Sequence, residues 1–232
     1  MDAVVMAAGL GTRLRPLTER WAKPVLPIDG RPVIALLLRE LAAAGCRRVW
    51  VVTGHLAEQV EGLIGDGPAF GVDIHFVRQP GVLGSADAVQ RALRDGARAP
   101  SVVSAADTVF TAGDVGRFVA AFAASGAAGA LAVRTVPGRD SGRPGVRREG
   151  DRIVQMRDDD PGLVWTPAPL WGLGGAVAER LCLDRPPYEL GNAYQSAIDA
   201  GEAVTAIEIG TTRDLTDPLD LVEENFSYLR GI

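Results

Sequence analysis

Short apolar runs alternate with segments of helical periodicity along the first 135 residues. Buried-strand patterns occur at residues 2–7, 49–53, 73–77, 101–104 and 128–134. Helical patterns lie between them at residues 32–44, 57–64, 85–94 and 114–124, with Ser85 as the expected cap of the third. This alternation predicts an α/β fold, in which a mixed, mostly parallel sheet is flanked by helices on both faces.

The alternation ends after residue 135, where Pro, Gly, Arg and Asp become frequent. We interpret residues 137–163 as a β-hairpin excursion that covers one side of the sheet, with short strands at 145–146 and 152–154; a disordered surface loop is the alternative. Beyond it the pattern predicts an apolar stretch near 169–173, helices at 176–181 and 192–200, a strand at 203–209 and a closing helix at 217–229. Because no repeat or linker interrupts the chain, we expect a single domain over residues 1–232.

Composition and charge exclude several classes of protein. A net charge of −5 argues against a nucleic-acid partner. Cys46 and Cys182 show neither metal nor disulfide spacing, which is typical of core thiols in a reducing cytoplasm. The first strand follows no basic leader and no apolar run is long enough to cross a bilayer, so we expect a cytoplasmic protein without a membrane partner. Assembly into homo-oligomers stays open.

A glycine-rich loop follows the first strand and reads Ala7-Ala8-Gly9-Leu10-Gly11-Thr12-Arg13. Glycines at such a place let backbone N–H groups approach a phosphate. Neither the third glycine of a dinucleotide fingerprint nor the Gly-Lys-Ser/Thr of a Walker loop is present. Lys23 follows ten residues after Arg13 and is the single lysine among 24 basic residues. A compact ammonium suits a phosphate oxygen in a tight site better than a guanidinium fork does, although chance survival at the surface is the alternative.

A longer series of motifs carries a family resemblance. The glycine loop with Lys23-Pro24 is followed, in order, by residues 26–34, by Gln79-Pro80 with residues 83–88, by residues 105–110, by Glu208-Ile209-Gly210-Thr211 and by residues 213–226. This series resembles the nucleotidylyltransferases that join a nucleoside triphosphate to a sugar 1-phosphate and release pyrophosphate. The resemblance is to the short forms that lack a C-terminal β-helix. It implies the Rossmann-like nucleotide-diphospho-sugar transferase fold.

The resemblance also implies roles for the loop and its two cations. The nucleotide would be bound by Ala7, Ala8, Gly9, Gly11 and Thr12. Arg13 is the candidate for the triphosphate and the departing pyrophosphate, and Lys23 for an oxygen of the α-phosphate. The attacking sugar phosphate is already ionised, so no general base is required and catalysis rests on positioning and charge neutralisation.

The expected cofactor is Mg²⁺, which prefers oxygen ligands. Asp107 follows a buried strand, and Glu208 ends another, so we expect these two carboxylates to hold the ion. The alternatives are a turn cap for Asp107 and a solvated carboxylate for Glu208. Glu208 stands where the family usually has Asp, and its extra methylene requires the metal or the strand to shift.

The sequence gives weaker signals for the residues that bind the nucleobase and the acceptor. Gln79 offers a donor and an acceptor to a uracil or thymine edge, and backbone groups near Gly84 could complete the pairing, which favours UTP or dTTP. An ordinary surface amide is the alternative for Gln79. Glu189 resembles an acidic residue that relatives use to hold sugar hydroxyls; a solvated carboxylate is its alternative.

The acceptor half departs from the family pattern. A lysine that touches the sugar phosphate in many relatives is replaced in the stretch Arg157-Asp158-Asp159-Asp160-Pro161, whose carboxylates should repel a phosphate. Arg143, Arg147 or Arg157 could substitute for it. The expected partners are therefore a nucleoside triphosphate and a phosphorylated small-molecule acceptor.

Two other functions fit the same motifs. The first is a phosphocholine cytidylyltransferase, whose quaternary ammonium would need an aromatic cage, for example Trp165, Trp171 and Tyr188. The second is a subunit that binds a nucleotide-sugar without turning it over.

Overall fold

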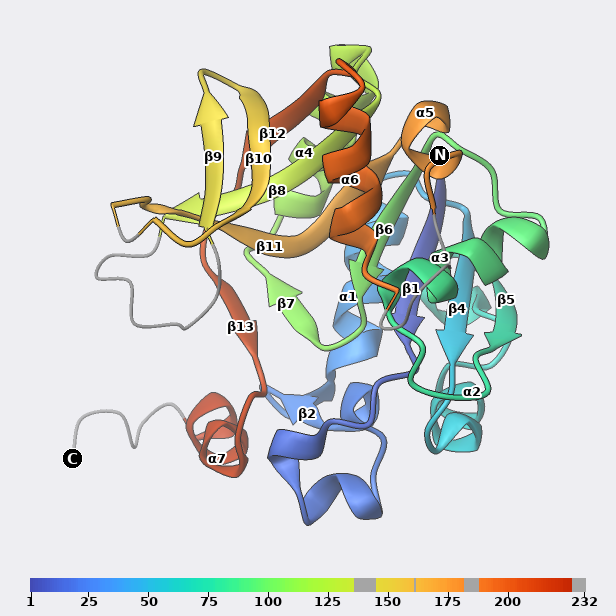
Figure 1. The fold of residues 1–232 in the computed structure, drawn as a ribbon. Helices are drawn as coiled ribbons and strands as arrows, with labels where there is room; N and C mark the ends of the chain where they lie inside the picture. Colours follow the sequence, from blue (N-terminus) through green and yellow to red (C-terminus); the bar gives the residue numbers. More distant parts are fainter. Residues whose placement is uncertain (136–144, 161, 182–187, 227–232) are drawn as a thin grey trace.

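The computed structural model describes residues 1–135, 145–160, 162–181 and 188–226 of the chain. Its largest sheet contains β1 (Asp2–Ala7), β4 (Arg48–Thr53), β5 (Asp73–Arg78), β6 (Ser101–Ala105), β8 (Gly129–Thr135), β9 (Gly145–Glu149), β10 (Arg152–Asp158), β11 (Trp165–Leu173) and β12 (Val204–Glu208). Their order across the sheet is β5-β4-β1-β6-β11-β8-β12-β10-β9 (Figure 1). Only β11 and β10 run against the other strands of this sheet. The predicted mixed, mostly parallel α/β fold is confirmed.

Helices cover both faces of this sheet. On one face lie α1 (Val33–Ala43), α2 (Ala57–Ile64) and α4 (Asp114–Ser125), and on the other α3 (Ser85–Arg94), α5 (Gly175–Ala178) and α6 (Leu190–Asp199). Strand β1 serves both cores, because Ala3 and Val5 pack on the first face and Val4 on the second. Since both faces of β1 are buried, its sequence is apolar at every position from Ala3 to Ala7.

The region after β8 differs from the prediction in two ways. The β9–β10 hairpin exists, but it extends the edge of the main sheet beside β12 and does not cover a face. Residues 136–144 of the predicted excursion lie outside the described residues. Strand β11 is nine residues long and includes Pro167 and Pro169. A register shift between Pro167 and Trp171 accommodates these prolines in a central strand.

The start of α3 also corrects a prediction. Gly84, at φ 101°, is the residue that precedes the helix, and Ser85 makes no capping hydrogen bond. The Ser85 hydroxyl instead donates to Glu189 Oε2 and accepts from the Leu190 N–H. Ser85 therefore joins the beginnings of α3 and α6.

A small second layer lies below the carboxyl end of β1. It contains three 3-10 turns (Thr12–Leu14, Leu17–Glu19, Lys23–Val25), two small sheets, β2 (Pro27–Ile28) with β3 (Arg31–Pro32) and β7 (Thr108–Phe110) with β13 (Thr212–Asp214), and α7 (Pro218–Asn225). Neither small sheet was predicted. The buried side chains of Leu14, Leu26, Ile28, Val33 and Leu215 join this layer into one cluster. The cluster ties the loop after β1 to the C-terminal segment.

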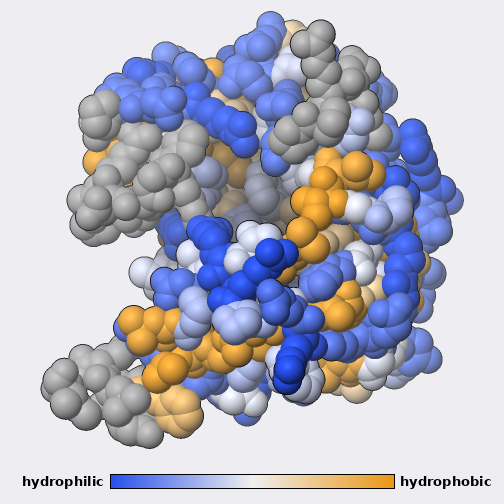
Figure 2. Space-filling model, turned by 60° about the horizontal axis from the view of Figure 1, so that its bottom comes forward, coloured by the Kyte–Doolittle hydropathy of each residue, from blue (hydrophilic) through white to orange (hydrophobic). Residues whose placement is uncertain are grey.

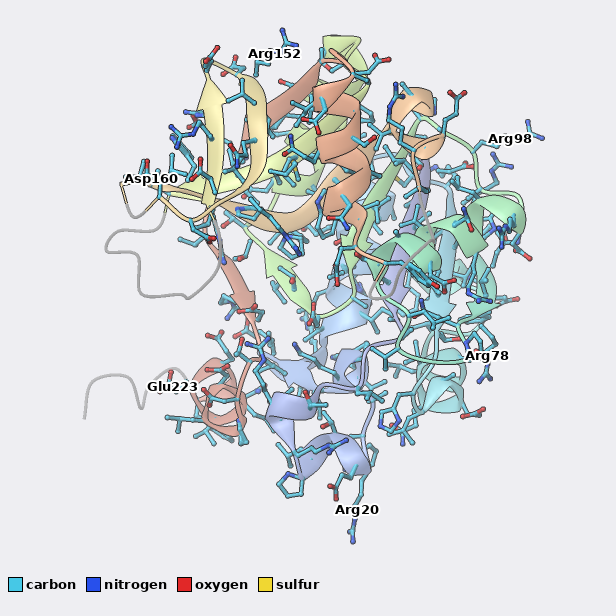
Figure 3. The ribbon with its side chains drawn as sticks, viewed as in Figure 1. Arg20, Arg78, Arg98, Arg152, Asp160 and Glu223 are labelled. Atoms are coloured by element: carbon cyan, nitrogen blue, oxygen red, sulfur yellow. The ribbon has the colours of Figure 1, made fainter. Side chains whose placement is uncertain are left out.

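Charged and hydrophobic side chains occupy different parts of the surface. Charged side chains such as Arg20, Arg98, Arg152 and Glu223 point outward (Figure 3). In Figure 2 hydrophobic residues form a band at the lower left and another patch at the upper right, and α7 leaves Leu219 exposed. A further 3-10 turn lies at Pro68–Phe70. Among the described helices, none has the length and apolar character needed to pass through a membrane.

Candidate active site

The loop after β1 is tightly folded and requires glycine at one position. Gly11 has φ 59°, and a Cβ placed on it would lie 2.8 Å from Thr18 Cγ2. The Thr18 hydroxyl donates to the Gly11 carbonyl across 2.9 Å. The close approach and the positive φ both exclude larger residues, so the course of the loop is set by the protein itself.

A cleft of about 260 Å³ opens between this loop and the carboxyl end of β6. It is lined by most of the predicted residues of the glycine loop, by both predicted cations and by one predicted metal ligand, namely Ala7, Gly9, Gly11, Thr12, Arg13, Lys23 and Asp107. Lys23 Nζ donates to Asp107 Oδ2 across 2.5 Å, although 84 positions separate the two residues. Arg13 makes no ion pair within the described parts of the chain. The cleft thus combines one paired cation, one unpaired cation and one carboxylate.

The carboxylate of Asp107 is oriented by side chains. Its Oδ2 accepts from Lys23 and its Oδ1 accepts from the Thr108 hydroxyl, at 3.4 Å. No backbone N–H of the described residues donates to it, which argues against the alternative of a turn cap. Asp107 is therefore placed to face a ligand in the cleft.

Glu208 lies elsewhere. Its carboxylate pairs with Arg148 of β9 across 2.7 Å, and it lines a different hollow near α4. Glu208 is not among the residues that line the cleft with Asp107. No group of three or more His, Cys, Asp or Glu in the described residues is arranged as a metal cluster. The structure does not bring the two predicted metal ligands together.

A second aspartate, Asp214, is paired across a small sheet with the residue that follows Asp107. Asp214 of β13 pairs with Thr108 of β7 in an antiparallel register, so the two side chains lie on the same face of that small sheet. Thr108 is itself bonded to Asp107, and Thr216, two residues beyond Asp214, lines the cleft. The sequence analysis missed Asp214. One signal in the sequence could have pointed to it. Asp214 stands directly before Leu215 and the turn into α7, much as Asp107 stands just after β6.

A second hollow, of about 430 Å³, adjoins the same loop. It is lined by Ala8, Leu10, Gly54, His55, Arg78, Gln79, Pro80, Gly81 and Val82. Gln79 is only 6% exposed, so it is not a surface amide. The His55 imidazole is bonded to the Thr18 carbonyl, as expected of a structural histidine. Arg78 at the end of β5 pairs with Glu58 and Glu61 of α2.

Gly84 has a structural reason to be glycine. A Cβ there would lie 2.4 Å from the Tyr188 carbonyl oxygen. The Gly84 carbonyl accepts a hydrogen bond from Gln79, and Gly84 itself does not line the second hollow among the described residues. In this structure Gly84 therefore affects the second hollow only by holding the Gln79 amide with its carbonyl.

A third hollow, of about 300 Å³, lies between α3, α6 and the hairpin. Its walls are Ser85, Met156, Arg157, Pro167, Trp171, Glu189, Leu190 and Gly191. It contains the predicted acceptor residue Glu189, which accepts from Ser85 across 3.0 Å. The hollow is mostly apolar, with Arg157 as its one cation among the described residues. Such a site suits an acceptor that has an anionic group and a less polar body.

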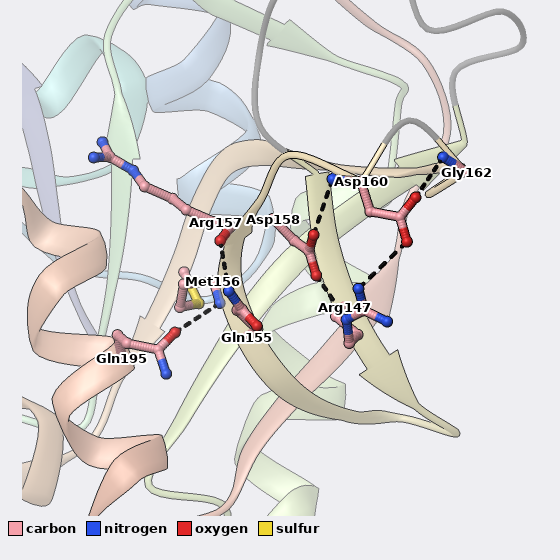
Figure 4. A network of polar contacts seen from close by, with 8 residues as sticks. All are labelled: Arg147, Gln155, Met156, Arg157, Asp158, Asp160, Gly162 and Gln195. Carbon is pink, nitrogen blue, oxygen red and sulfur yellow. Dashed lines mark hydrogen bonds and ion pairs between the residues drawn. The ribbon is translucent and has the colours of Figure 1, made fainter.

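Asp158 and Asp160, which lie near Arg157 in the sequence, interact with Arg147 instead (Figure 4). Arg147 donates to Asp158 across 2.6 Å and to Asp160 across 3.3 Å. These carboxylates raise the pKa of Arg147, chiefly through the hydrogen bond to Asp158. Arg157 extends away from this network and makes no side-chain hydrogen bond to any described residue. Of the three arginines considered for the acceptor phosphate, Arg147 is therefore engaged, Arg143 lies outside the described residues, and Arg157 reaches the hollow.

The aromatic cage that the phosphocholine alternative would need is not assembled among the described residues. Trp171 lines the third hollow, whereas Trp165 is covered by the Arg148 guanidinium at 3.7 Å from its ring centre. Tyr188 is not among the described residues that line this hollow. One aromatic ring beside a carboxylate does not make a cage for a quaternary ammonium.

Comparison with known proteins identifies the family. Residues 2–157 match the family model described as nucleotidyl transferase. The chain belongs to this family. Its relatives include a glucose-1-phosphate thymidylyltransferase of Streptomyces antibioticus, 43% identical over 89 residues that make up 38% of this chain and 25% of that protein. The N-acetylmuramate alpha-1-phosphate uridylyltransferase of Neisseria meningitidis serogroup B is 39% identical over 94 residues, 40% of this chain and 41% of that protein.

The match to a longer relative covers nearly the whole chain. The low-salt glycan biosynthesis nucleotidyltransferase Agl11 of Haloferax volcanii is 27% identical over 237 residues, which cover 97% of this chain and 65% of the relative. Matches therefore span from a quarter to about two thirds of these nucleotidyltransferases. The solved UDP-glucose pyrophosphorylase of Acinetobacter baumanii superposes with a TM-score of 0.84 at 20% identity, covering 98% of this chain and 92% of that one. This similarity confirms the nucleotide-diphospho-sugar transferase fold.

Proposed function

We propose that this nucleotidyl transferase joins UTP or dTTP to a sugar 1-phosphate and releases pyrophosphate. The observation that carries the proposal is the cleft in which Lys23, Arg13 and Asp107 lie together beside a glycine loop. The carboxyl ends of parallel strands are where open α/β sheets bind ligands, and this cleft lies at the ends of β1 and β6. The relatives act on sugar 1-phosphates with more than one nucleotide, so the nucleotide and the sugar are proposals from this chain's own residues.

The reaction needs positioning and positive charge. A phosphate oxygen of the acceptor attacks the α-phosphorus, a new P–O bond forms, and the bond to pyrophosphate breaks. Arg13, which has no ion pair in the described residues, is free to bind the triphosphate and the leaving pyrophosphate. Lys23 leaves Asp107 and neutralises an oxygen of the α-phosphate. The acceptor is already an anion, so no side chain has to remove a proton.

Mg²⁺ is the cation that the donor chemistry of the cleft fits. Asp107 lines the cleft and offers carboxylate oxygens that Lys23 neutralises at present. Asp214 does not line the cleft among the described residues, but it lies across the β7–β13 pair from Thr108, the residue after Asp107. When Lys23 turns to the phosphate, the Asp107 carboxylate is left for another cation. We propose Asp107 and Asp214 as the protein ligands. Bound magnesium would supply charge neutralisation for the phosphates.

The second and third hollows are proposed as the base and acceptor sites. Gln79 is buried at the edge of the second hollow, where a nucleobase could pair with its amide. Arg157 and Glu189 lie in the third hollow, where the guanidinium could hold the acceptor phosphate and the carboxylate could accept from hydroxyls. The engagement of Arg147 by two aspartates supports Arg157 as the substitute for the lysine found in relatives.

Pyrophosphate release from purified protein tests the function. UTP, dTTP, CTP and GTP would each be combined with Mg²⁺ and a panel of sugar 1-phosphates, with phosphocholine as a further acceptor. We expect release with UTP or dTTP and at least one sugar phosphate, and much slower release from a Lys23→Met variant. Turnover of phosphocholine alone would instead indicate the cytidylyltransferase alternative. Nucleotide-sugar binding without any turnover would indicate a non-catalytic subunit.

A further inference from the structure

Helix α3 starts beside Gln79, and the Asp87 carboxylate on its first turn lies against the Gln79 amide. Gln79 Nε2 donates to Asp87 Oδ2 across 2.8 Å and to the Gly84 carbonyl across 3.0 Å. Both residues are buried, since 6% of Gln79 and 3% of Asp87 are exposed. The amide nitrogen has two hydrogens, so both are used within the protein.

The nature of these two partners decides which way the amide faces. A backbone carbonyl and an ionised carboxylate can only accept hydrogen bonds, so the amide nitrogen must face them. The opposite orientation would place Gln79 Oε1 against two acceptors in a buried site, which is unfavourable. Oε1 is therefore the end of the amide that remains for a ligand in the second hollow, and none of the described residues donates to it.

Arg91 keeps Asp87 in the form that only accepts. Its Nε donates to the same Asp87 oxygen across 2.6 Å, one helical turn further along α3. Burial raises the pKa of the Asp87 carboxyl, but the hydrogen bonds from Arg91 and Gln79 outweigh this effect, so the pKa lies below its ordinary value. A protonated Asp87 would carry a donor and would tolerate a reversed amide; the ionised form does not.

We propose that Asp87 and Arg91 are positioning residues for nucleobase choice, because they hold Gln79 so that it offers the base an acceptor and no donor. The inference rests on the proposed function and deepens it. An acceptor matches the N3–H of uracil and thymine, whereas cytosine has an unprotonated N3 that would face Oε1. The arrangement therefore favours UTP and dTTP over CTP. Guanine also has a ring N–H that could meet this acceptor. The predicted preference is therefore one among pyrimidine nucleotides, for UTP and dTTP over CTP.

Equilibrium binding of UTP, dTTP and CTP to the full chain, measured by titration calorimetry, tests this without knowledge of the acceptor. We expect the unaltered protein to bind UTP and dTTP at least about tenfold more tightly than CTP. Asp87→Asn introduces a side chain that can donate, and should reduce this ratio by about tenfold. Arg91→Gln changes a half-buried residue at less risk to folding, and should reduce the ratio by a smaller factor.

Asp95→Asn is the matched control. Asp95 ends the same helix and accepts from Trp50 Nε1 across 3.1 Å, so this variant removes the same charge without touching Gln79. It should leave the ratio unchanged. A double-mutant cycle separates positioning from a general structural role: in a Gln79→Leu background there is no amide to orient, so Asp87→Asn should no longer alter the ratio.

The outcomes separate this inference from the function on which it rests. A folded Asp87→Asn protein that keeps the full UTP-to-CTP ratio would overturn the inference, as would unaltered protein that binds CTP as tightly as UTP. Pyrophosphate release from UTP or dTTP with a sugar 1-phosphate in those cases would leave the proposed function standing. If the unaltered protein bound none of the triphosphates, both would fail.

Discussion

Lys23 Nζ lies 2.5 Å from Asp107 Oδ2, so the single lysine of the chain is held by the carboxylate that faces the same cleft. The side chains are partly withdrawn from water, with 13% of Lys23 and 32% of Asp107 exposed. A polyanion that enters the cleft competes with Asp107 for the ammonium, and a cation competes with Lys23 for the carboxylate. Nucleotide and metal binding are therefore expected to favour each other.

The Lys23 side chain should be needed for turnover more than for nucleotide affinity. We expect Lys23→Met to reduce kcat by about 10²–10³-fold, as removal of a preorganised charge at the transition state usually does. Lys23→Arg should restore little, because a planar fork does not replace a point charge in a confined site. Steady-state pyrophosphate release measures both variants. A kcat of Lys23→Met close to that of the unaltered protein would contradict the assigned role.

The metal ligands can be distinguished by a matched set of three variants. Asp107→Asn and Asp214→Asn should each abolish magnesium-dependent pyrophosphate release, because each removes a charged oxygen ligand. Glu208→Gln should leave the dependence on magnesium unchanged, since Glu208 is paired with Arg148 and lines a different hollow near α4. Titration of activity with Mg²⁺ is the measurement. The reverse result, with Glu208 essential and Asp214 dispensable, would support the original assignment from sequence.

The central strands and helices could be predicted because their patterns are local. Strand β1 is apolar from Ala3 to Ala7 and packs against both cores, and α1 repeats its apolar residues at helical spacing. Strand β11 was recognised only in part because Pro167 and Pro169 weaken the strand pattern. Pairing with β6 and β8, on chain segments far away in the sequence, defines it instead.

The part of the candidate site built from contiguous residues could be predicted, whereas the proposed ligand Asp214 depends on strand pairing that the sequence does not show. The glycine loop, Arg13 and Lys23 are close in sequence and meet in one cleft. Asp214 reaches this end of the sheet only through the register between β13 and β7, which joins segments about 100 residues apart. Glu208 matches the family motif more closely in sequence than Asp214 does. In the structure, however, its side chain pairs with Arg148.

Gly11 is expected to be required for the fold of the loop as well as for ligand binding. Gly11→Ala would force an L-residue to φ 59° and bring Cβ within 2.8 Å of Thr18 Cγ2, which should lower the free energy of unfolding by about 1–3 kcal/mol. Gly62→Ala is the control: it lies inside α2 with no atom within 4 Å of the new Cβ, and should raise that free energy by about 0.5–1 kcal/mol. Urea denaturation compares the two. Equal stability of both variants would show that the loop is not constrained at Gly11.

Arg157 should determine affinity for the acceptor but not for the nucleotide. Its guanidinium lies in the third hollow with Glu189, away from the pair formed by Arg147 and Asp158. Removing a charge-assisted contact to a phosphate should raise the acceptor KM of Arg157→Ala by about tenfold or more, with the nucleotide KM unchanged. Arg152→Ala, on the exposed part of the same strand β10, is the control and should change neither constant. An unchanged acceptor KM in Arg157→Ala would place the acceptor phosphate on another residue.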